Sequence, residues 1–160
     1  RSALANWAAD YGAAPAIFRN IFMAAADVAN ECLEPGGDGA VIPQAARNLV
    51  VYHAADDFAL RSSKVANLRN KIVTRRLGHT GPERMDRVPA NVVAVDCDAF
   101  NSAYARLGHT YFLGDRQGRP GAVLRHIVET MRTGRPGTRL QMLCEPPPAA
   151  NDAQADLRVA

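Results

Sequence analysis

Three short apolar runs, each closed by an aspartate, constrain the fold of this chain more than any other feature of its sequence. The first is residues 21–26, within a segment that spans residues 17–28, and the other two are residues 49–53 and 92–95. Runs this short, apolar on both faces and rich in branched side chains, are typical of strands buried within a parallel sheet. We therefore predict three parallel strands.

Helical patterns alternate with the predicted strands. Residues 3–11 carry apolar side chains at helical spacing, and patterns of the same period cover residues 60–69 and 122–132. The connection after the first strand is rich in glycine and proline, and residues 43–47 within it favour a short helix. The alternation predicts an α/β fold with right-handed crossovers, in which a three-stranded parallel sheet of order 1-2-3 is flanked by helices.

Length and composition indicate one soluble globular domain. The chain has 160 residues, of which 48% are apolar and 22% are charged. We expect residues 1–143 to form a single α/β domain. Residues 144–160 include three consecutive prolines and favour a flexible tail. No apolar run approaches the roughly 18 to 20 residues of a membrane helix, so we expect no membrane partner.

The charged residues and the cysteines limit the partners and the compartment. The net charge is +3, and arginine supplies almost all the positive charge, since Lys64 and Lys71 are the only lysines. The arginines are scattered among acids, whereas a nucleic-acid surface needs them clustered on one face, so no nucleic-acid partner is expected. Cys32, Cys97 and Cys144 are widely spaced and indicate neither a disulfide framework nor a zinc motif. A reducing, cytoplasmic compartment is favoured.

The residues best suited to chemistry lie where the predicted strands end. Aspartates follow all three strands, at Asp27, at Asp56 and Asp57, and at Asp96. Ligands of open α/β sheets bind beyond the carboxyl ends of the strands, so these carboxylates are candidates for a site. Aspartate is also a common turn and capping residue, which is the alternative for each of them. In the adjacent pair, one carboxylate could face the site while the other caps the helix.

His109 follows a glycine in the loop after the third predicted strand. There it can reach an acid at the end of the neighbouring strand, and that acid would fix the imidazole tautomer while the second ring nitrogen activates a nucleophile. A histidine in a loop can equally have no such role. A metal site that joins His79 and His109 with an acid is another alternative, although we expect no metal and no other cofactor. His53 and His126 lie in a strand and a helix and are interpreted as structural.

Three segments resemble a family of largely uncharacterised bacterial α/β-hydrolases. They are residues 18–28, 50–61 and 107–112. In such proteins the catalytic triad runs serine, aspartate, histidine along the chain. The resemblance covers roughly residues 1–139 and implies the C-terminal part of an α/β-hydrolase fold. Residue by residue, it implies that Asp57 is the acid and His109 the base, with Asp27 as the alternative acid.

The resemblance also implies a serine hydrolase of the esterase type, with a small acyl ester as substrate. The chain contains no Gly-x-Ser-x-Gly motif, and residues 1–11 resemble the rest of the helix that follows the nucleophile. We therefore expect the nucleophilic serine to lie upstream, in an N-terminal hydrolase half. On this interpretation the chain is a fragment of a hydrolase, with a truncated homologue as the alternative, and it is inactive by itself.

A non-catalytic binding or assembly module is the alternative from a different functional class. The first predicted strand presents an apolar edge unless another strand covers it. In such a module this edge would pair with another subunit, so the partner would be a second copy in a homo-oligomer.

Overall fold

The computed structural model describes residues 3–60, 75–99, 109–114 and 119–144. Strands alternate with helices and long connections along this part of the chain. In chain order the elements are the helix α1 (Ala3–Tyr11), the strand β1 (Phe18–Ala24), the 3-10 helix η1 (Pro43–Ala45), the strand β2 (Ala46–His53), the helix α3 (Leu77–Thr80), the strand β3 (Val92–Asp96), the helix α5 (Ala122–Thr133) and the strand β4 (Leu140–Met142).

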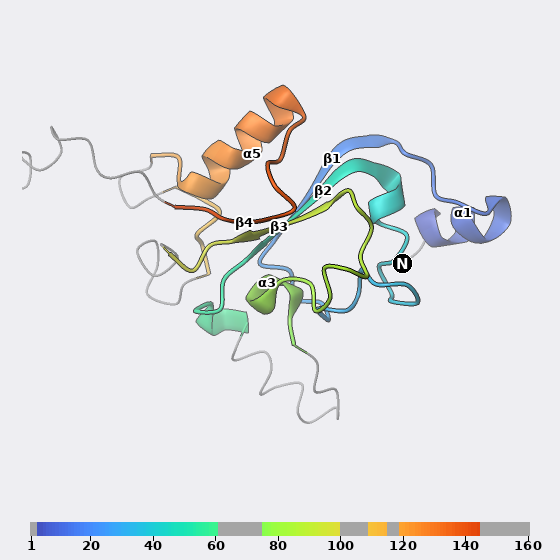
Figure 1. The fold of residues 1–160 in the computed structure, drawn as a ribbon, viewed down its shortest axis with the longest axis horizontal. Helices are drawn as coiled ribbons and strands as arrows, with labels where there is room; N and C mark the ends of the chain where they lie inside the picture. Colours follow the sequence, from blue (N-terminus) through green and yellow to red (C-terminus); the bar gives the residue numbers. More distant parts are fainter. Residues whose placement is uncertain (1–2, 61–74, 100–108, 115–118, 145–160) are drawn as a thin grey trace, which may run out of the picture.

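The four strands form one parallel sheet in the order β1-β2-β3-β4, so neighbours in sequence are neighbours in space (Figure 1). Ala24, the last residue of β1, lies opposite Tyr52, and His53, the last residue of β2, lies opposite Asp96. Because all strands run the same way, their carboxyl ends lie along one edge of the sheet. The loops that leave this edge carry the candidate site residues.

The sheet has one strand more than the sequence predicts. The α/β class and the order of the first three strands are confirmed, but the expectation of only three strands is wrong. β4 pairs with β3 from Ala94 opposite Leu140 to Asp96 opposite Met142. Leu140 and Met142 are 66% and 60% exposed, and a polar residue lies between them. β4 therefore has no continuous apolar run, and its position is set by backbone pairing with β3.

Side chains of β2 and β3 alternate between two apolar layers, one on each face of the sheet. The layer beneath α5 includes Val50, Tyr52, Val93, Val95, Ala122 and Val123. The layer on the opposite face includes Cys32, Leu33, Leu49, Val51, Leu77 and Val92. In Figure 1, α5 lies above the sheet and α3 lies below it. Burial on both faces explains why these strands are continuous apolar runs in the sequence.

The helices predicted over residues 3–11 and 122–132 are confirmed. Both end at a glycine with positive φ, Gly12 at +82° and Gly134 at +70°, the conformation that commonly closes a helix. The short helix expected over residues 43–47 is confirmed only in part, because η1 ends at Ala45 and β2 begins at the next residue.

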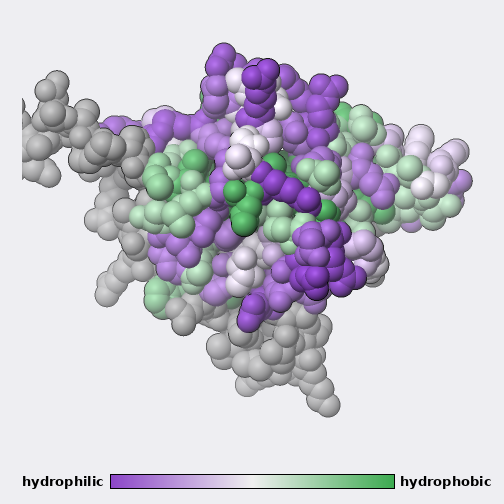
Figure 2. Space-filling view, viewed as in Figure 1, coloured by the Kyte–Doolittle hydropathy of each residue, from purple (hydrophilic) through white to green (hydrophobic). Residues whose placement is uncertain are grey.

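The helix α1 lies at the periphery of the molecule (Figure 1). None of its side chains is buried, and Trp7 and Tyr11 are 48% and 71% exposed. Figure 2 shows hydrophilic side chains over the outer face of α5, whereas the surface at α1 mixes apolar and polar side chains. The two helices thus differ in how they contact the fold: α5 covers the sheet, and α1 does not.

Two predictions fall on residues outside the described ranges. The helix expected over residues 60–69 is described only at its first residue, and the tail expected over residues 144–160 only at Cys144. The proposed limits of the domain therefore stay predictions. Within the described ranges, no helix is both long enough and apolar enough to cross a membrane.

Candidate active site

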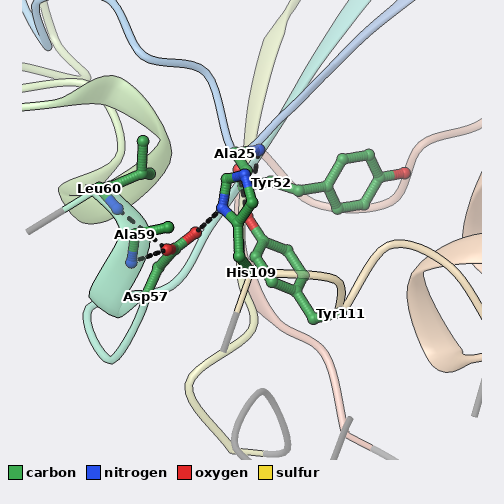
Figure 3. A network of polar contacts seen from close by, with 7 residues as sticks. All are labelled: Ala25, Tyr52, Asp57, Ala59, Leu60, His109 and Tyr111. Atoms are coloured by element: carbon green, nitrogen blue, oxygen red, sulfur yellow. Dashed lines mark hydrogen bonds and ion pairs between the residues drawn. The ribbon is translucent and has the colours of Figure 1, made fainter. Parts of the chain in front are cut away.

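The carboxylate of Asp57 and the imidazole of His109 meet beyond the carboxyl end of β2 (Figure 3). His109 Nδ1 lies 2.8 Å from Asp57 Oδ2. Asp57 is completely buried, whereas 43% of the His109 side chain is exposed. The contact predicted from the positions of these two residues is present, and it joins residues 52 positions apart in the chain.

The second carboxylate oxygen of Asp57 holds the acid in place. Oδ1 accepts hydrogen bonds from the backbone N–H groups of Ala59 at 3.0 Å and Leu60 at 3.1 Å. These donors belong to the helical turn at residues 58–60, so Asp57 is its N-cap. Both roles that the sequence suggested dividing between Asp56 and Asp57 fall to Asp57, one to each oxygen.

His109 is oriented for proton transfer through its second ring nitrogen. An ionised carboxylate can only accept a hydrogen bond, so the proton of this hydrogen bond is carried by Nδ1. The other ring nitrogen, Nε2, then keeps a lone pair. None of the described residues bonds to Nε2. The ring stands edge-on to Phe112, with centroids 6.2 Å apart and an interplanar angle of 87°. This arrangement suits a general base that takes a proton from an incoming hydroxyl group.

Tyr111, two residues after the histidine, ties residues 109–114, here called the histidine loop, to the sheet. Its side chain is completely buried. The hydroxyl accepts a hydrogen bond from the backbone N–H of Ala25 and donates one to the carbonyl of Tyr52, both at 3.2 Å (Figure 3). Burial raises the pKa of the Tyr111 phenol, so the group stays protonated. The sequence prediction missed this residue, although a polar aromatic side chain two positions from the candidate base was a signal for it.

Asp27 has a different partner. Its Oδ1 lies 3.0 Å from Nε of Arg76, and half of its side chain is exposed. His109 therefore pairs with the acid that follows β2, while the acid that follows β1 pairs with an arginine. The geometry gives no support to Asp27 as the alternative acid.

Two other carboxylates at this edge accept hydrogen bonds from backbone N–H groups. Asp96 Oδ1 accepts the backbone N–H of Asp98 at 2.9 Å, and Asp98 Oδ1 accepts the backbone N–H of Ala55. Partial burial raises the pKa of Asp98, and the nearby carboxylates of Asp96 and Asp56 act in the same direction. The turn-forming role that aspartates often play after strands therefore applies to Asp96.

The other histidines do not join His109. His126 accepts a hydrogen bond from the Tyr52 hydroxyl at 2.7 Å, in keeping with its structural interpretation. Burial lowers the pKa of His53, which ends β2, and His79 lies in α3. Among residues 3–60, 75–99, 109–114 and 119–144, no three histidine, cysteine or acidic side chains converge as a metal site would require. The alternative metal site thus has no geometric support there.

The cysteines are poor candidates for a nucleophile. Burial raises the pKa of the Cys32 thiol to about 11 and also raises that of Cys97, so both are protonated near neutral pH. Cys144 is exposed and lies at the end of the described residues. The four serines of the sequence are Ser2, Ser62, Ser63 and Ser102, and all of them lie outside the described ranges.

Comparison of the chain with known proteins finds no match. No protein-family model matches the chain. No curated protein matches it, and no solved structure does either.

Proposed function

We propose that this chain supplies the acid and the general base of a serine hydrolase that acts on acyl esters. The observation that carries the proposal is the 2.8 Å contact between buried Asp57 and half-exposed His109, in which no described residue bonds to Nε2. A buried carboxylate that fixes one imidazole nitrogen is the arrangement by which acid–histidine pairs activate a hydroxyl nucleophile.

In the proposed reaction, His109 Nε2 removes the proton from a serine hydroxyl as that oxygen attacks the ester carbonyl. The imidazolium that forms is stabilised by the Asp57 carboxylate, which itself stays ionised. His109 then returns the proton to the leaving alcohol, and in the second half-reaction it activates water in the same way. The hydrogen bonds from Ala59 and Leu60 to Asp57 keep the acid aligned through both steps.

The nucleophile in this proposal is a serine N-terminal to Arg1. This assignment follows from the resemblance to α/β-hydrolases, in which serine precedes the acid and the histidine along the chain. The coding sequence upstream of Arg1 tests it directly: a Gly-x-Ser-x-Gly motif within about ten residues supports the assignment. Turnover of a short p-nitrophenyl ester by the isolated chain, abolished by replacing Ser62 or Ser102, would contradict it.

A fluorophosphonate probe, which reacts with activated serines, tests the role of His109 in the complete gene product. We expect His109→Gln to slow labelling at least about 100-fold, because the serine loses its base. The tetrapeptide Leu-Gly-His-Thr occurs twice in the sequence, at residues 77–80 and 107–110. His79→Gln is the matched control, since His79 has the same place in the first copy that His109 has in the second. Labelling of His109→Gln at the unmodified rate would refute the proposal.

The assembly module keeps one observation in its favour. Among the described strands, β1 lies at one end of the sheet and pairs with β2 alone, and Phe18 at its start is 48% exposed. Unpaired strand edges are sites at which another chain can add a strand. Light scattering tests this alternative: a dimer that Phe18→Lys converts to a monomer supports it, and a monomer at all concentrations opposes it.

A further inference from the structure

We propose that Tyr111 is a positioning residue that sets the orientation of the His109 ring against Asp57. The catalytic consequence of this role rests on the proposed function, whereas its effect on the imidazole does not. The proposal follows from the place of the Tyr111 hydroxyl, which bridges the exits of β1 and β2 two residues beyond the histidine.

The hydroxyl makes a polar connection between the histidine loop and the sheet. It accepts the N–H of Ala25 just after β1 and donates to the carbonyl of Tyr52 within β2, each at 3.2 Å. Asp57 follows β2 by a few residues and is itself joined to that exit, since its N–H donates to the carbonyl of Ala54 at 3.2 Å. Asp57 and the loop that carries His109 are therefore both hydrogen-bonded to the backbone at the end of β2.

Residues 110–113 form a tight turn next to His109, so a constraint on Tyr111 reaches the histidine. The backbone N–H of Leu113 donates to the carbonyl of Thr110 at 2.9 Å, which makes a tight turn around Tyr111. The N–H of Gly121 donates to the carbonyl of Leu113 at 3.2 Å. With this turn fixed, only Thr110 separates the anchored tyrosine from the histidine.

Ala25, which follows β1 and donates to the Tyr111 hydroxyl, is itself held in an unusual conformation. Ala25 has φ of +47°, in the left-handed region that residues with a Cβ adopt at a cost. Gly78 packs directly against the backbone of Ala25 and Ala26, and a Cβ at that position would overlap both. The N–H of Gly78 donates to the carbonyl of Ala26 at 2.9 Å. Backbone from α3 thus supports Ala25 on one side, and Tyr111 bonds its N–H on another.

This arrangement also gives a structural role to the first Leu-Gly-His-Thr tetrapeptide, which forms α3 and has no part in the proposed reaction. Its leucine is buried in the core and its glycine allows α3 to approach the β1 exit. The N–H of Leu77 donates to the carbonyl of Val28 at 2.8 Å. The tetrapeptide therefore braces the strand exit to which Tyr111 is anchored, while the second copy supplies His109.

The variant Tyr111→Phe removes both hydrogen bonds and keeps the ring in the core. In ¹⁵N NMR of the imidazole, wild type should show one His109 tautomer, with the proton on Nδ1. We expect Tyr111→Phe to show a mixture of tautomers and a changed pH midpoint for His109. Tyr11→Phe is the matched control, because Tyr11 is exposed in α1, and it should leave the His109 signals unchanged. Identical tautomer populations and midpoints in Tyr111→Phe and wild type would overturn the proposal.

A second measurement on the unmodified protein covers the case in which Tyr111→Phe fails to fold. The Ala25 amide proton and the Tyr111 hydroxyl proton should exchange slowly with solvent, because each is bonded within a buried contact. Rapid exchange of both would also overturn the proposal.

Activity of the complete gene product separates this inference from the proposed function. We expect Tyr111→Phe to lower kcat about tenfold with KM little changed, and to move the pH midpoint of kcat together with that of His109. A changed His109 tautomer in a protein without hydrolase activity would support the positioning role and refute the hydrolase. Activity that requires His109 but shows an unchanged pH profile in Tyr111→Phe would refute the positioning role alone.

Discussion

His109 and His126 are both partly buried, and each bonds to a side chain in or just after β2, His126 to Tyr52 and His109 to Asp57. They differ in the hydrogen bonds that their ring nitrogens make. Among the described residues, His109 bonds through one nitrogen alone, Nδ1, to Asp57. His126 uses both: Nδ1 accepts from the Tyr52 hydroxyl at 2.7 Å, and Nε2 donates to the carbonyl of Pro136 at 3.1 Å. The first ring has a lone pair left for chemistry, and the second has none.

The chemical nature of the partner accounts for the rest of the difference. The Asp57 carboxylate accepts a hydrogen bond and so holds a proton on Nδ1 of His109. A phenol and a carbonyl do not compensate for a buried positive charge, and burial lowers the pKa of His126. The partners of a histidine therefore indicate its role better than its degree of burial does. We expect the following changes to separate the two sites, from the largest effect to the smallest.

Asp57→Asn should have the largest effect, because it reverses the hydrogen bond to His109. An amide can donate to Nδ1 and so favours the tautomer with its proton on Nε2, where the base is blocked. By analogy with the serine-protease triad, kcat of the complete gene product should fall about 10⁴-fold. Asparagine is as good an N-cap as aspartate, so the thermal midpoint should change little.

Asp86→Asn is the control for this substitution. Asp86 is exposed and pairs with Arg84 at 2.8 Å. It has no role in the proposed reaction. It should keep the wild-type kcat. A kcat within tenfold of wild type in Asp57→Asn would mean that the contact with His109 has no part in catalysis.

Tyr52→Phe should act on stability alone. It leaves Nδ1 of His126 without its donor in a partly buried site, and the free energy of unfolding should fall by about 1 to 3 kcal/mol. The backbone carbonyl of Tyr52 that receives the Tyr111 hydroxyl is unaffected by this change. Urea denaturation provides the measurement, and esterase activity at 25 °C should be retained. A large loss of kcat in a folded Tyr52→Phe protein would show that the two sites are not separate.

The pH dependence of stability should show a smaller effect of His126. Its pKa is lowered in the folded state, whereas an unfolded chain has histidine pKa values of about 6.5. Below that pH the unfolded chain binds a proton that folded His126 does not, so the free energy of unfolding decreases as pH falls from about 6.5 toward the folded pKa. Above about pH 7 both states are neutral and no such loss occurs.

Comparison with His126→Gln isolates this effect, because His53 and the carboxylates contribute equally to both proteins. Between pH 8 and pH 5, wild type should lose more stability than the variant in urea denaturation. Parallel stability profiles would show that His126 is protonated as readily in the folded protein as in the unfolded chain.

Most of the fold was predictable because its central strands are buried on both faces. Residues 49–52 of β2 and 92–95 of β3 are buried apolar or aromatic side chains, which leaves a clear signal in the sequence. β4 left no such signal, because Leu140 and Met142 are more than half exposed and the residue between them is polar. Its position depends on pairing with β3, about 46 residues earlier in the chain. Local patterns report burial, and they do not report a strand that is fixed by long-range backbone bonds.

The candidate site was predictable to the same extent and for a related reason. The strand ends place Asp57 and His109 at one edge of the sheet, and their contact is confirmed. Which of two adjacent aspartates turns inward depends on the local backbone, here the capping of residues 58–60 by Asp57. The role of Tyr111 depends on Ala25 and Tyr52, which lie 86 and 59 residues away, so no local pattern contains it.

The all-parallel order of the sheet also has a consequence for how the chain folds. No two neighbouring strands form a hairpin, and even the nearest cross-strand contact, between Asn20 and Asn48, spans 28 residues. Each strand pair must therefore close a long loop before its hydrogen bonds can form, which slows folding relative to a helical bundle of the same length. Asp57 follows β2 and His109 follows β3 along the chain, so pairing of these two strands brings the two residues near each other. We expect their contact to be among the last contacts formed during folding.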